Sequence, residues 1–409
     1  MAQVINTNVM SLNAQRNLNT SGSNLATSIQ RLSSGLRINS AKDDAAGLAI
    51  SERFSTQIRG LDVAVRNAND GISLAQTAEG AMVEIGNNLQ RIRELAVQSA
   101  NATNSATDRK ALDAEVKQLT AEIDRVARQT NFNGTALLDG SFSGALFQVG
   151  ADAGQTISIN SITNAQSNKL GTTKFDANSV TFVVAGTNAT TSQNITGMKL
   201  KGADGVDYDL GTITVAPGAT AAETLTLTTA AVAAAMNAKM DQTGILAEVD
   251  ATTAGKINLT SIKESFTADG TFRPITFTAG SIPTGLSASQ TFTATTATNG
   301  AAIVGKNVSD VNITTVSGSQ QALTIIDKAL TSINSARADM GAIQNRFTST
   351  VANLSTTSEN LSASRSRIRD TDYAKETAEL TRTQILQQAG TAMLAQANSA
   401  PQNILSLLG

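Results

Sequence analysis

The sequence predicts a mainly α-helical coiled-coil rod that is built from both chain ends and carries a β-rich domain inserted in the middle, an α+β protein overall. Three observations predict this fold. Apolar residues recur every seven positions in an N-terminal and a C-terminal segment, as in a coiled-coil seam. The middle of the chain is rich in Thr, Gly, Ala and Ser, with short alternating runs. The two ends are patterned like helices but are nearly free of charge.

Two heptad columns define the predicted rod. One runs from Phe54 to Ala96, and the other, of equal length, runs from Ile326 to Ile368. Because heptad helices need partners, we expect the two columns to pair. The residues that we assign to this rod seam are Phe54, Leu61, Met82, Leu89, Ile326, Ile333, Met340, Phe347, Leu354, Leu361 and Ile368.

Local signals divide the chain into three zones. Residues 1–140 are expected to be helical apart from a turn at 101–105, after which Ser105 and Asp108 fit a capping box. Residues 141–320 contain Pro217, Pro274 and Pro283, three of the four prolines. Residues 321–400 are again expected to be helical. In the middle zone we predict strands at 181–185, 207–215, 245–250, 256–260 and 291–294, and a short helix at 230–240.

The terminal segments lack the charged outer face of a solvated amphipathic helix. Residues 1–30 contain one charged side chain, Arg16, and residues 383–409 contain none. Such helices need neighbours on more than one side, so we predict a polymer in which the ends of many copies form a shared core. The predicted assembly residues are Ile5, Val9, Leu12, Leu25, Ile29, Leu32, Leu36, Ile385, Leu386, Ala389, Met393, Leu394, Leu405 and Leu408.

The composition argues against catalysis and metal binding. The 409 residues include no His, Cys or Trp, which removes the commonest general base and metal ligand and all thiolate chemistry. The formal net charge is −2, so we expect no nucleic-acid or membrane partner. We also expect neither a signal peptide nor a transmembrane segment. We therefore assign no catalytic residue, no cofactor and no metal.

Two acidic clusters have alternative interpretations. Asp43 and Asp44 could form an acid–base pair, but adjacent residues on a helix point in different directions, so a cap or a turn is favoured. Asp204, Asp207 and Asp209 could bind Ca²⁺, but this segment lacks the spacing and the final Glu of an EF-hand loop.

Several motifs resemble those of bacterial flagellin, over about residues 1–160 and 310–409. They follow the same order along the chain. The motifs are Arg31–Leu48 (RLSSGLRINSAKDDAAGL), Arg66–Ser73 (RNANDGIS), Leu89–Gln98 (LQRIRELAVQ), Phe132–Gly134 followed by Leu137 and Leu138, Ser366–Asp372 (SRIRDTD) and Asn403–Leu408 (NILSLL).

The resemblance implies the structural subunit of a hollow flagellar filament used for swimming motility. It implies an inner tube formed by 1–44 plus 366–409, a helical rod of 45–170 plus 306–365, and a variable outer domain at 171–305. The unfolded chain would leave the cell through the flagellar type III apparatus, without a cleaved signal peptide, and become part of the extracellular filament. Implied partners are further copies of the chain, an export chaperone, the filament cap, hook–filament junction proteins and host flagellin receptors.

The resemblance also implies two recognition sites. Gln30–Ser51 is similar to an epitope sensed by a plant leucine-rich-repeat receptor kinase. Within it, Asp43 matches a position that tolerates change poorly, and Leu36 departs from a common version of the epitope. Arg91, Leu95 and Glu115 match residues that the animal Toll-like flagellin receptor contacts.

Three alternatives stay open at this point. A hook–filament junction protein shares the terminal pattern, although 30–51 and 89–98 match the filament subunit better. A coiled-coil surface adhesin would place its head at one end of the stalk instead of within the chain. A secreted enzyme would need its chemistry in a middle region without His, Cys or Trp.

Overall fold

The computed structural model describes residues 7–183, 191–283, 289–294 and 303–399. One compact unit comprises Met1–Gly71, Leu146–Ile157 and Arg346–Gly409, and a second comprises Ile72–Ala145 and Ser158–Asn345. The helices are α1 (Val9–Ser34), α2 (Ala45–Ala100), α3 (Ala106–Gln129), α4 (Ala221–Asn237), α5 (Met240–Thr243), α6 (Val316–Arg369) and α7 (Tyr373–Ser399), with a 3-10 turn η1 (Val308–Asp310). The strands are β1 (Asn131–Phe132), β2 (Thr135–Ala136), β3 (Ala145–Gln148), β4 (Thr156–Ile159), β5 (Ala177–Val183), β6 (Gln193–Ile195), β7 (Lys199–Lys201), β8 (Asp207–Asp209), β9 (Ile213–Val215), β10 (Ile245–Val249), β11 (Lys256–Ser261), β12 (Thr276–Thr278) and β13 (Ser289–Thr293).

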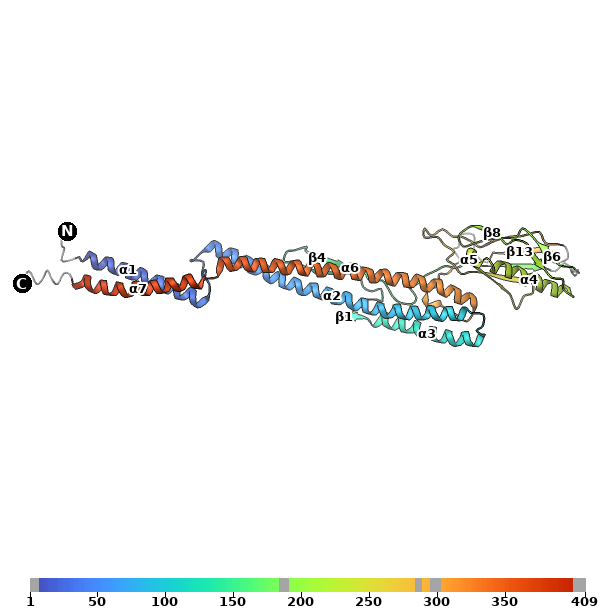
Figure 1. Cartoon of the computed structure of the whole chain (residues 1–409), viewed down its shortest axis with the longest axis horizontal. Helices are drawn as coiled ribbons and strands as arrows, with labels where there is room; N and C mark the ends of the chain where they lie inside the picture. Colours follow the sequence, from blue (N-terminus) through green and yellow to red (C-terminus); the bar gives the residue numbers. More distant parts are fainter. Residues whose placement is uncertain (1–6, 184–190, 284–288, 295–302, 400–409) are drawn as a thin grey trace, which may run out of the picture. The chain divides into compact units, whose positions relative to one another are not determined.

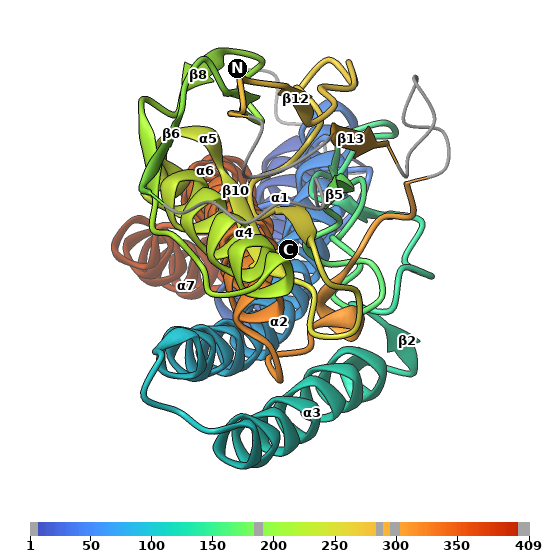
Figure 2. The ribbon, with the colours of Figure 1, turned by 90° about the vertical axis from the view of Figure 1, so that its right-hand side faces the viewer.

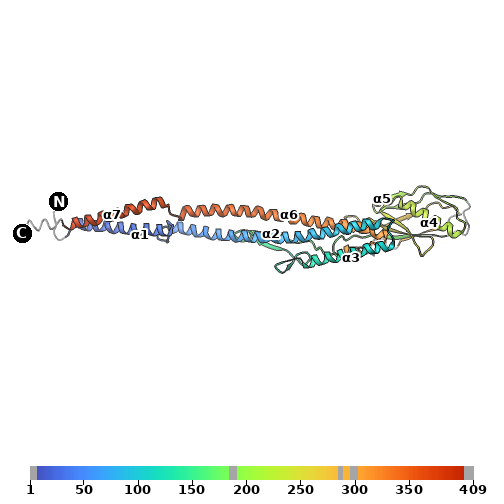
Figure 3. The ribbon, with the colours of Figure 1, turned by 60° about the horizontal axis from the view of Figure 1, so that its bottom comes forward.

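Long helices from both ends of the chain pack together, which confirms the predicted fold class. Helix α1 lies beside α7, and α2 lies beside α6, in Figures 1 and 3. Both pairs are antiparallel. All the strands of the described residues lie in the chain between α2 and α6. The α-helical prediction for residues 1–140 was wrong at 35–44, where a loop separates α1 from α2, and at 130–140, which contain β1 and β2. The prediction for 321–400 was wrong at 370–372, between α6 and α7.

The seam between α2 and α6 contains the two heptad columns. On α2, Leu61, Met82 and Leu89 are buried and Phe54 is half-buried. On α6, burial decreases along the helix. Ile326, Ile333, Met340 and Phe347 are buried, whereas Leu354, Leu361 and Ile368 are half-buried.

Polar contacts fix the antiparallel register of α2 and α6. In the first unit, Arg369 forms an ion pair with Glu52, with Nη1 and Oε1 2.9 Å apart. In the second unit, Arg93 contacts Asp327 at 2.7 Å, and the Gln344 amide donates to Glu79 at 2.7 Å. Each exposed ion pair contributes little free energy, so the buried apolar columns supply most of the stability and the polar pairs select the register.

Helix α3 packs as a third helix against the second-unit part of α2, and Figure 2 looks nearly along these helices. The predicted capping box is confirmed, because the Ser105 side chain accepts from the Asp108 N–H and the Asp108 carboxylate accepts from the Ser105 N–H. The Asp113 carboxylate, 2 % exposed, accepts from the Ile313 N–H at 3.0 Å and pairs with Lys117. This buried carboxylate therefore ties α3 to the segment that leads into α6.

The β-rich part has its own apolar core between α4 and three antiparallel sheets. The sheets have the orders β10-β11-β5-β13, β12-β7-β8 and β6-β9. Helix α4 packs mainly on β10 and β9, and Thr220 caps its start through the Glu223 N–H. The core includes Val180, Phe182, Leu200, Val232, Met236, Ile257 and Leu259.

The structure corrects two expectations in this region. The run expected as one strand at 207–215 forms β8 and β9, because Gly211 adopts φ 73° between them. The helix expected at 230–240 begins earlier, at Ala221, and α5 follows it as a separate short helix. A Thr-rich stretch with low helix propensity hides the true start of α4, which its Thr220 cap marks.

The β-rich part is also held against α6 by side chains. The Gln321 amide donates to the Ser261 carbonyl at 2.8 Å, and the Thr324 hydroxyl donates to the Ile262 carbonyl at 2.7 Å. Lys328 continues the same helix face and contacts Glu264 at 2.8 Å. Three successive positions on one face of α6 thus hold the segment that follows β11.

Two glycines of α2 make a matched test of the seam. A Cβ added at Gly71 would lie 2.6 Å from Cζ of Phe347, whose ring also meets Phe147 edge-on at 5.5 Å. A Cβ at Gly80 would meet nothing within 4 Å.

We expect Gly80→Ala to stabilise the chain by up to about 1 kcal/mol through helix propensity. Gly71→Ala should instead destabilise it by about 1 kcal/mol or more through overpacking. Urea unfolding followed by circular dichroism measures both, and equal shifts for the two variants would contradict this packing.

Candidate assembly and recognition surfaces

The helix pair α1–α7 in the first unit is connected by polar contacts. The Asn8 amide donates to the Ala397 carbonyl at 2.7 Å, and the Ser11 hydroxyl donates to the Asn398 side chain at 2.7 Å. At the opposite end of the pair, Arg31 faces Glu376 at 3.9 Å. Within the described residues, Arg31 Nε and Glu376 Oε1 are buried and have no hydrogen-bond partner, so one copy of the chain leaves this contact incomplete.

The interior of this helix pair is polar. In α1 the buried residues are Ser11 and Ser28, and in α7 they are Glu376, Thr383 and Ala397. None of these side chains is a large apolar one, and the hydrophobic contribution to pairing grows with the apolar area removed from water. The contact between α1 and α7 therefore supplies little hydrophobic stabilisation.

The predicted assembly residues lie mainly on the outside of the pair. Val9, Met393 and Ile385 are 65 %, 64 % and 59 % exposed. Leu12, Ile29, Leu386 and Ala389 are also exposed, Leu25, Leu32, Leu36 and Leu394 are half-buried, and Ile5, Leu405 and Leu408 lie outside the described residues. The large apolar side chains of the pair are thus exposed or half-buried, and the fully buried positions other than Ala397 are polar. The role of these apolar side chains in assembly stays a prediction.

A shallow groove of about 610 Å³ runs between α1 and α7. Its apolar lining comes from Met10, Leu18, Leu386 and Met393, and the helices approach closely at Gly390, where an added Cβ would lie 3.1 Å from Leu18. None of its lining residues is charged. Met10 was not among the predicted assembly residues, although the low charge of residues 1–30 predicted that neighbours cover these helices.

The break between the helices is organised by two carboxylates. Asp43 accepts from the Ser40 N–H at 2.9 Å, the Ser40 hydroxyl at 3.0 Å and the Asn39 N–H at 3.1 Å. Asp44 accepts from the Gly47 N–H at 2.8 Å and so caps the start of α2. These contacts agree with the turn and cap interpretation of Asp43 and Asp44, and not with an acid–base pair.

This loop is joined to the break between α6 and α7. Gly35 ends α1 in the left-handed conformation, with φ 71°, and Leu36 forms an isolated antiparallel bridge with Asp370. The Arg37 guanidinium donates to the Ile368 carbonyl at 2.6 Å. Both chain segments therefore leave helical geometry at the same level of the first unit.

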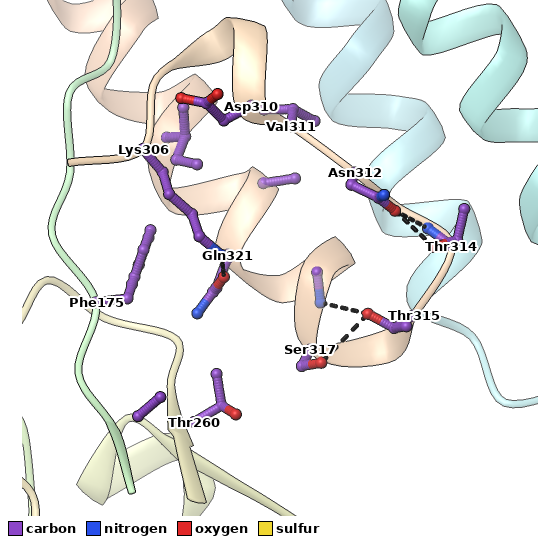
Figure 4. Close-up of a pocket in the computed structure, with 14 residues that line it drawn as sticks. Phe175, Thr260, Lys306, Asp310, Val311, Asn312, Thr314, Thr315, Ser317 and Gln321 are labelled. Atoms are coloured by element: carbon purple, nitrogen blue, oxygen red, sulfur yellow. Dashed lines mark hydrogen bonds between the residues drawn. The ribbon is translucent and has the colours of Figure 1, made fainter. Parts of the chain in front are cut away.

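A cavity of about 480 Å³ lies in the second unit, beside the start of α6 (Figure 4). Of its lining residues, Lys306 and Asp310 are charged. Lys306 donates to the Gln321 side chain at 2.8 Å, and Asp310 accepts from the Asn307 N–H at 3.0 Å. Both charges already have partners in the protein, so this lining offers no free acid–base pair.

The acidic run in the β-rich part does not form a cluster. Asp204 accepts from the Tyr208 hydroxyl at 2.5 Å, Asp207 faces Lys201, and Asp209 accepts from the Gly211 N–H. The described residues contain no group of three or more His, Cys, Asp or Glu that could hold a metal. Across those same residues, no helix combines the length and the apolar character that spanning a membrane requires.

Comparison with known proteins identifies the family. Residues 5–143 match the model of the bacterial flagellin N-terminal helical region, and residues 323–408 match that of the C-terminal helical region. The B-type flagellin of Pseudomonas aeruginosa is 42% identical, and flagellin D of Vibrio anguillarum is 44% identical, each over 100% of both chains. The chain belongs to the bacterial flagellin family. Flagellins are structural proteins, and this family identity favours a filament subunit over an enzyme.

Solved flagellar proteins resemble the chain less closely. The structure of FliC from Burkholderia pseudomallei is 27% identical and covers 68% of this chain and 99% of that chain, with a TM-score of 0.37. The flagellar hook-associated protein-3 from Legionella pneumophila is 16% identical and covers 78% of this chain and 98% of that chain, with a TM-score of 0.41.

The flagellin residues predicted to meet an animal receptor lie at the contact of α2 with α3. Arg91 pairs with Glu94 at 3.0 Å and with Glu115 at 2.9 Å, and these two hydrogen bonds, in that order of effect, raise the pKa of the Arg91 guanidinium. Arg91 and Glu115 have exposed side chains, whereas Leu95 is 1 % exposed beneath them. The structure thus brings Arg91 and Glu115 together on an accessible surface, with Leu95 as part of the core below.

In this flagellin, the hydrogen bonds to Asp43 make its loop dependent on pH. Donation from the Ser40 N–H and hydroxyl, and then from the Asn39 N–H, lowers the pKa of Asp43 below its ordinary value of 3.8. A lowered pKa stabilises the fold above the unfolded-state value, and this stabilisation is lost as the pH falls through the folded-state value.

We expect a carboxyl ¹³C titration to give Asp43 a pKa below 3.8, and Ser40→Ala to raise that pKa by removing one donor. Ser33→Ala, an exposed change in α1, is the control and should leave the pKa unchanged. An Asp43 pKa that does not respond to Ser40→Ala would contradict the assigned cause.

Proposed function

We propose that this chain is the subunit that polymerises through α1 and α7 into the hollow flagellar filament used for swimming. One observation carries the proposal. The α1–α7 pair exposes its apolar residues, such as Val9 and Met393, and buries Ser28 and Thr383. Apolar faces of this extent call for a partner, and further copies of the same helices would cover them.

The proposal assigns 1–44 plus 366–409 to an inner tube, 45–170 plus 306–365 to the helical part around it, and 171–305 to a variable outer domain. The incomplete contact between Arg31 and Glu376 supports the first assignment, because a neighbouring copy can complete it. Contacts made on association would then offset the entropic cost of ordering the terminal helices. The stability of the folded terminal helices would therefore rise with subunit concentration.

The proposal includes the route and the partners. The chain would leave the cell unfolded through the flagellar type III apparatus, without a cleaved signal peptide, and would reside in the extracellular filament. An export chaperone, the filament cap and hook–filament junction proteins would meet its terminal segments. The nearly uncharged ends support this, since they expose apolar side chains until assembly covers them.

A charge in the groove tests the assembly proposal. We expect Met393→Glu to lower the rate of elongation from sonicated filament seeds at least tenfold (about 1.4 kcal/mol or more), because the carboxylate would be desolvated on assembly. Met393 is 64 % exposed in the single chain, so the helix content of the monomer should not change.

The matched control is Ala254→Glu, which places the same charge on an exposed turn of the β-rich part. It should elongate like the unchanged chain. Negative-stain electron microscopy measures filament length in both cases. Normal filaments from Met393→Glu would reject the groove as an assembly surface, and unchanged chain that never elongates from seeds would reject the filament function.

We also propose that monomers, and not intact filaments, activate the host receptors. Arg91 and Glu115 would contact the animal Toll-like receptor, whereas Leu95, predicted as a third contact, is buried and would support them from below. Asp43 within 30–51 would serve the plant receptor kinase. A filament would cover much of this surface, which is the physical reason for the difference.

Two ion pairs on α2 and α3 allow a controlled test. We expect Arg91→Ala to reduce activation of the animal receptor at least about tenfold, in line with a loss of roughly 1.5–3 kcal/mol for a charged hydrogen-bonding group. Arg125→Ala breaks a similar exposed pair with Glu122 and should have no effect. A reporter-cell assay with monomers and with crosslinked filaments measures activation. Equal potency of crosslinked filaments, or equal loss in both variants, would contradict the proposal.

A further inference from the structure

The methionine side chains of this chain differ sharply in exposure. The structure describes seven of the eight, and four of these are at most 2 % exposed. Met10 and Met393 are 68 % and 64 % exposed. The four buried ones are Met82, Met198, Met236 and Met340, and Met240 is half-buried. Access of solutes to sulfur is therefore concentrated at two positions among the described methionines.

Those two positions belong to one surface. Met10 lies in the first turn of α1 and Met393 lies in α7, and both line the groove of about 610 Å³ between the two helices. Its other apolar lining residues are Ala14, Leu18, Leu386 and Ala389. The exposed thioethers thus sit within the surface that assembly is proposed to desolvate.

We propose that Met10 and Met393 form an oxidation-sensitive site that controls whether the free subunit can assemble. The oxidant is a small peroxide such as hydrogen peroxide. The thioether sulfur attacks one peroxide oxygen, the O–O bond breaks, the sulfur gains that oxygen as a sulfoxide, and the other oxygen leaves as water. Sulfur is oxidised by two electrons and the peroxide is reduced by two.

The consequence for assembly follows from polarity. A sulfoxide places a strong hydrogen-bond acceptor in a groove whose lining combines apolar side chains such as Leu18 and Leu386 with the uncharged polar side chains of Asn13, Asn17, Thr20, Ser21 and Asn24. Removing the sulfoxide from water costs more free energy than removing the thioether, so an oxidised subunit should associate less well. Once the groove is covered, the same sulfur atoms should be shielded. This inference rests on the proposed assembly function, whereas the selectivity of oxidation rests on exposure alone.

The first experiment measures that selectivity. Monomer is treated with dilute hydrogen peroxide for increasing times, digested, and analysed by mass spectrometry for added oxygen. We expect Met10 and Met393 to react at least about tenfold faster than Met82, Met198, Met236 and Met340, because oxidation follows exposure. Equal rates at all six positions would overturn the proposed site whether or not the protein forms filaments.

The second experiment measures elongation from seeds before and after the same treatment, and the treated-to-untreated ratio is the readout. We expect this ratio to fall at least about tenfold for the unchanged chain. The double variant Met10→Leu/Met393→Leu should keep a ratio near one. The control Met198→Leu/Met236→Leu should lose elongation like the unchanged chain. Methionine sulfoxide reductases A and B should restore it.

The outcomes separate this inference from the function on which it rests. Failure of untreated subunits to elongate would reject the filament function and the control of assembly together. Normal elongation of untreated subunits, with equal loss in unchanged chain and Met10→Leu/Met393→Leu, would reject only the oxidation site. Oxidation of Met10 and Met393 at the same rate in intact filaments and in monomers would overturn the shielding step.

Discussion

The fold depends on the antiparallel seam between α2 and α6, whose two halves are separated by more than two hundred residues of chain. Closing so long a loop has an entropic cost that local contacts cannot offset. Two matched heptad columns offset it by burying residues such as Met82, Leu89 and Ile333 continuously along the seam. The ion pair of Arg93 with Asp327 then excludes registers that would leave these charges opposite apolar surface. Within the second unit, α3 and the β-rich part both contact helices of this seam.

The recurring apolar residues of the two helix pairs have similar spacing but differ in how deeply they are buried. In α2–α6 the recurring residues are buried, so the pair is stable within one chain. In α1–α7 the recurring residues are exposed or half-buried, and Ser11, Ser28 and Thr383 occupy the interior. The difference lies in what flanks the apolar positions. The outer faces of α2 and α6 carry charges such as Glu52 and Asp327, whereas the faces of α1 and α7 are mostly uncharged Asn, Ser, Thr and Gln. A single copy can therefore fold its seam but cannot cover its terminal helices.

Much of this architecture could be predicted from the sequence, and the failures have physical reasons. The seven-residue spacing of apolar residues from Ile326 to Ile368 was enough to predict helix α6. The Ser105–Asp108 capping box predicted where α3 begins. The loop at 35–44 was missed because Leu32 and Leu36 keep helical spacing across Gly35, whose left-handed conformation ends α1. Apolar periodicity located the exposed groove residues on α7 but could not show that Met10 faces them from α1. The topology of the β-rich part depends on pairings between distant short strands, which alternation alone does not specify.

The β-rich part enters and leaves the helical part at nearly one point. Thr173 and Lys306 form an isolated antiparallel bridge, with N–H···O distances of 2.9 and 2.8 Å in the two directions. Any folded module whose own ends lie this close could be joined there without altering the chain separation that the seam requires. The contacts of Gln321, Thr324 and Lys328 with the segment after β11 would be the ones to re-engineer. The chain is thus suited to serve as a scaffold that carries a foreign domain between Thr173 and Lys306.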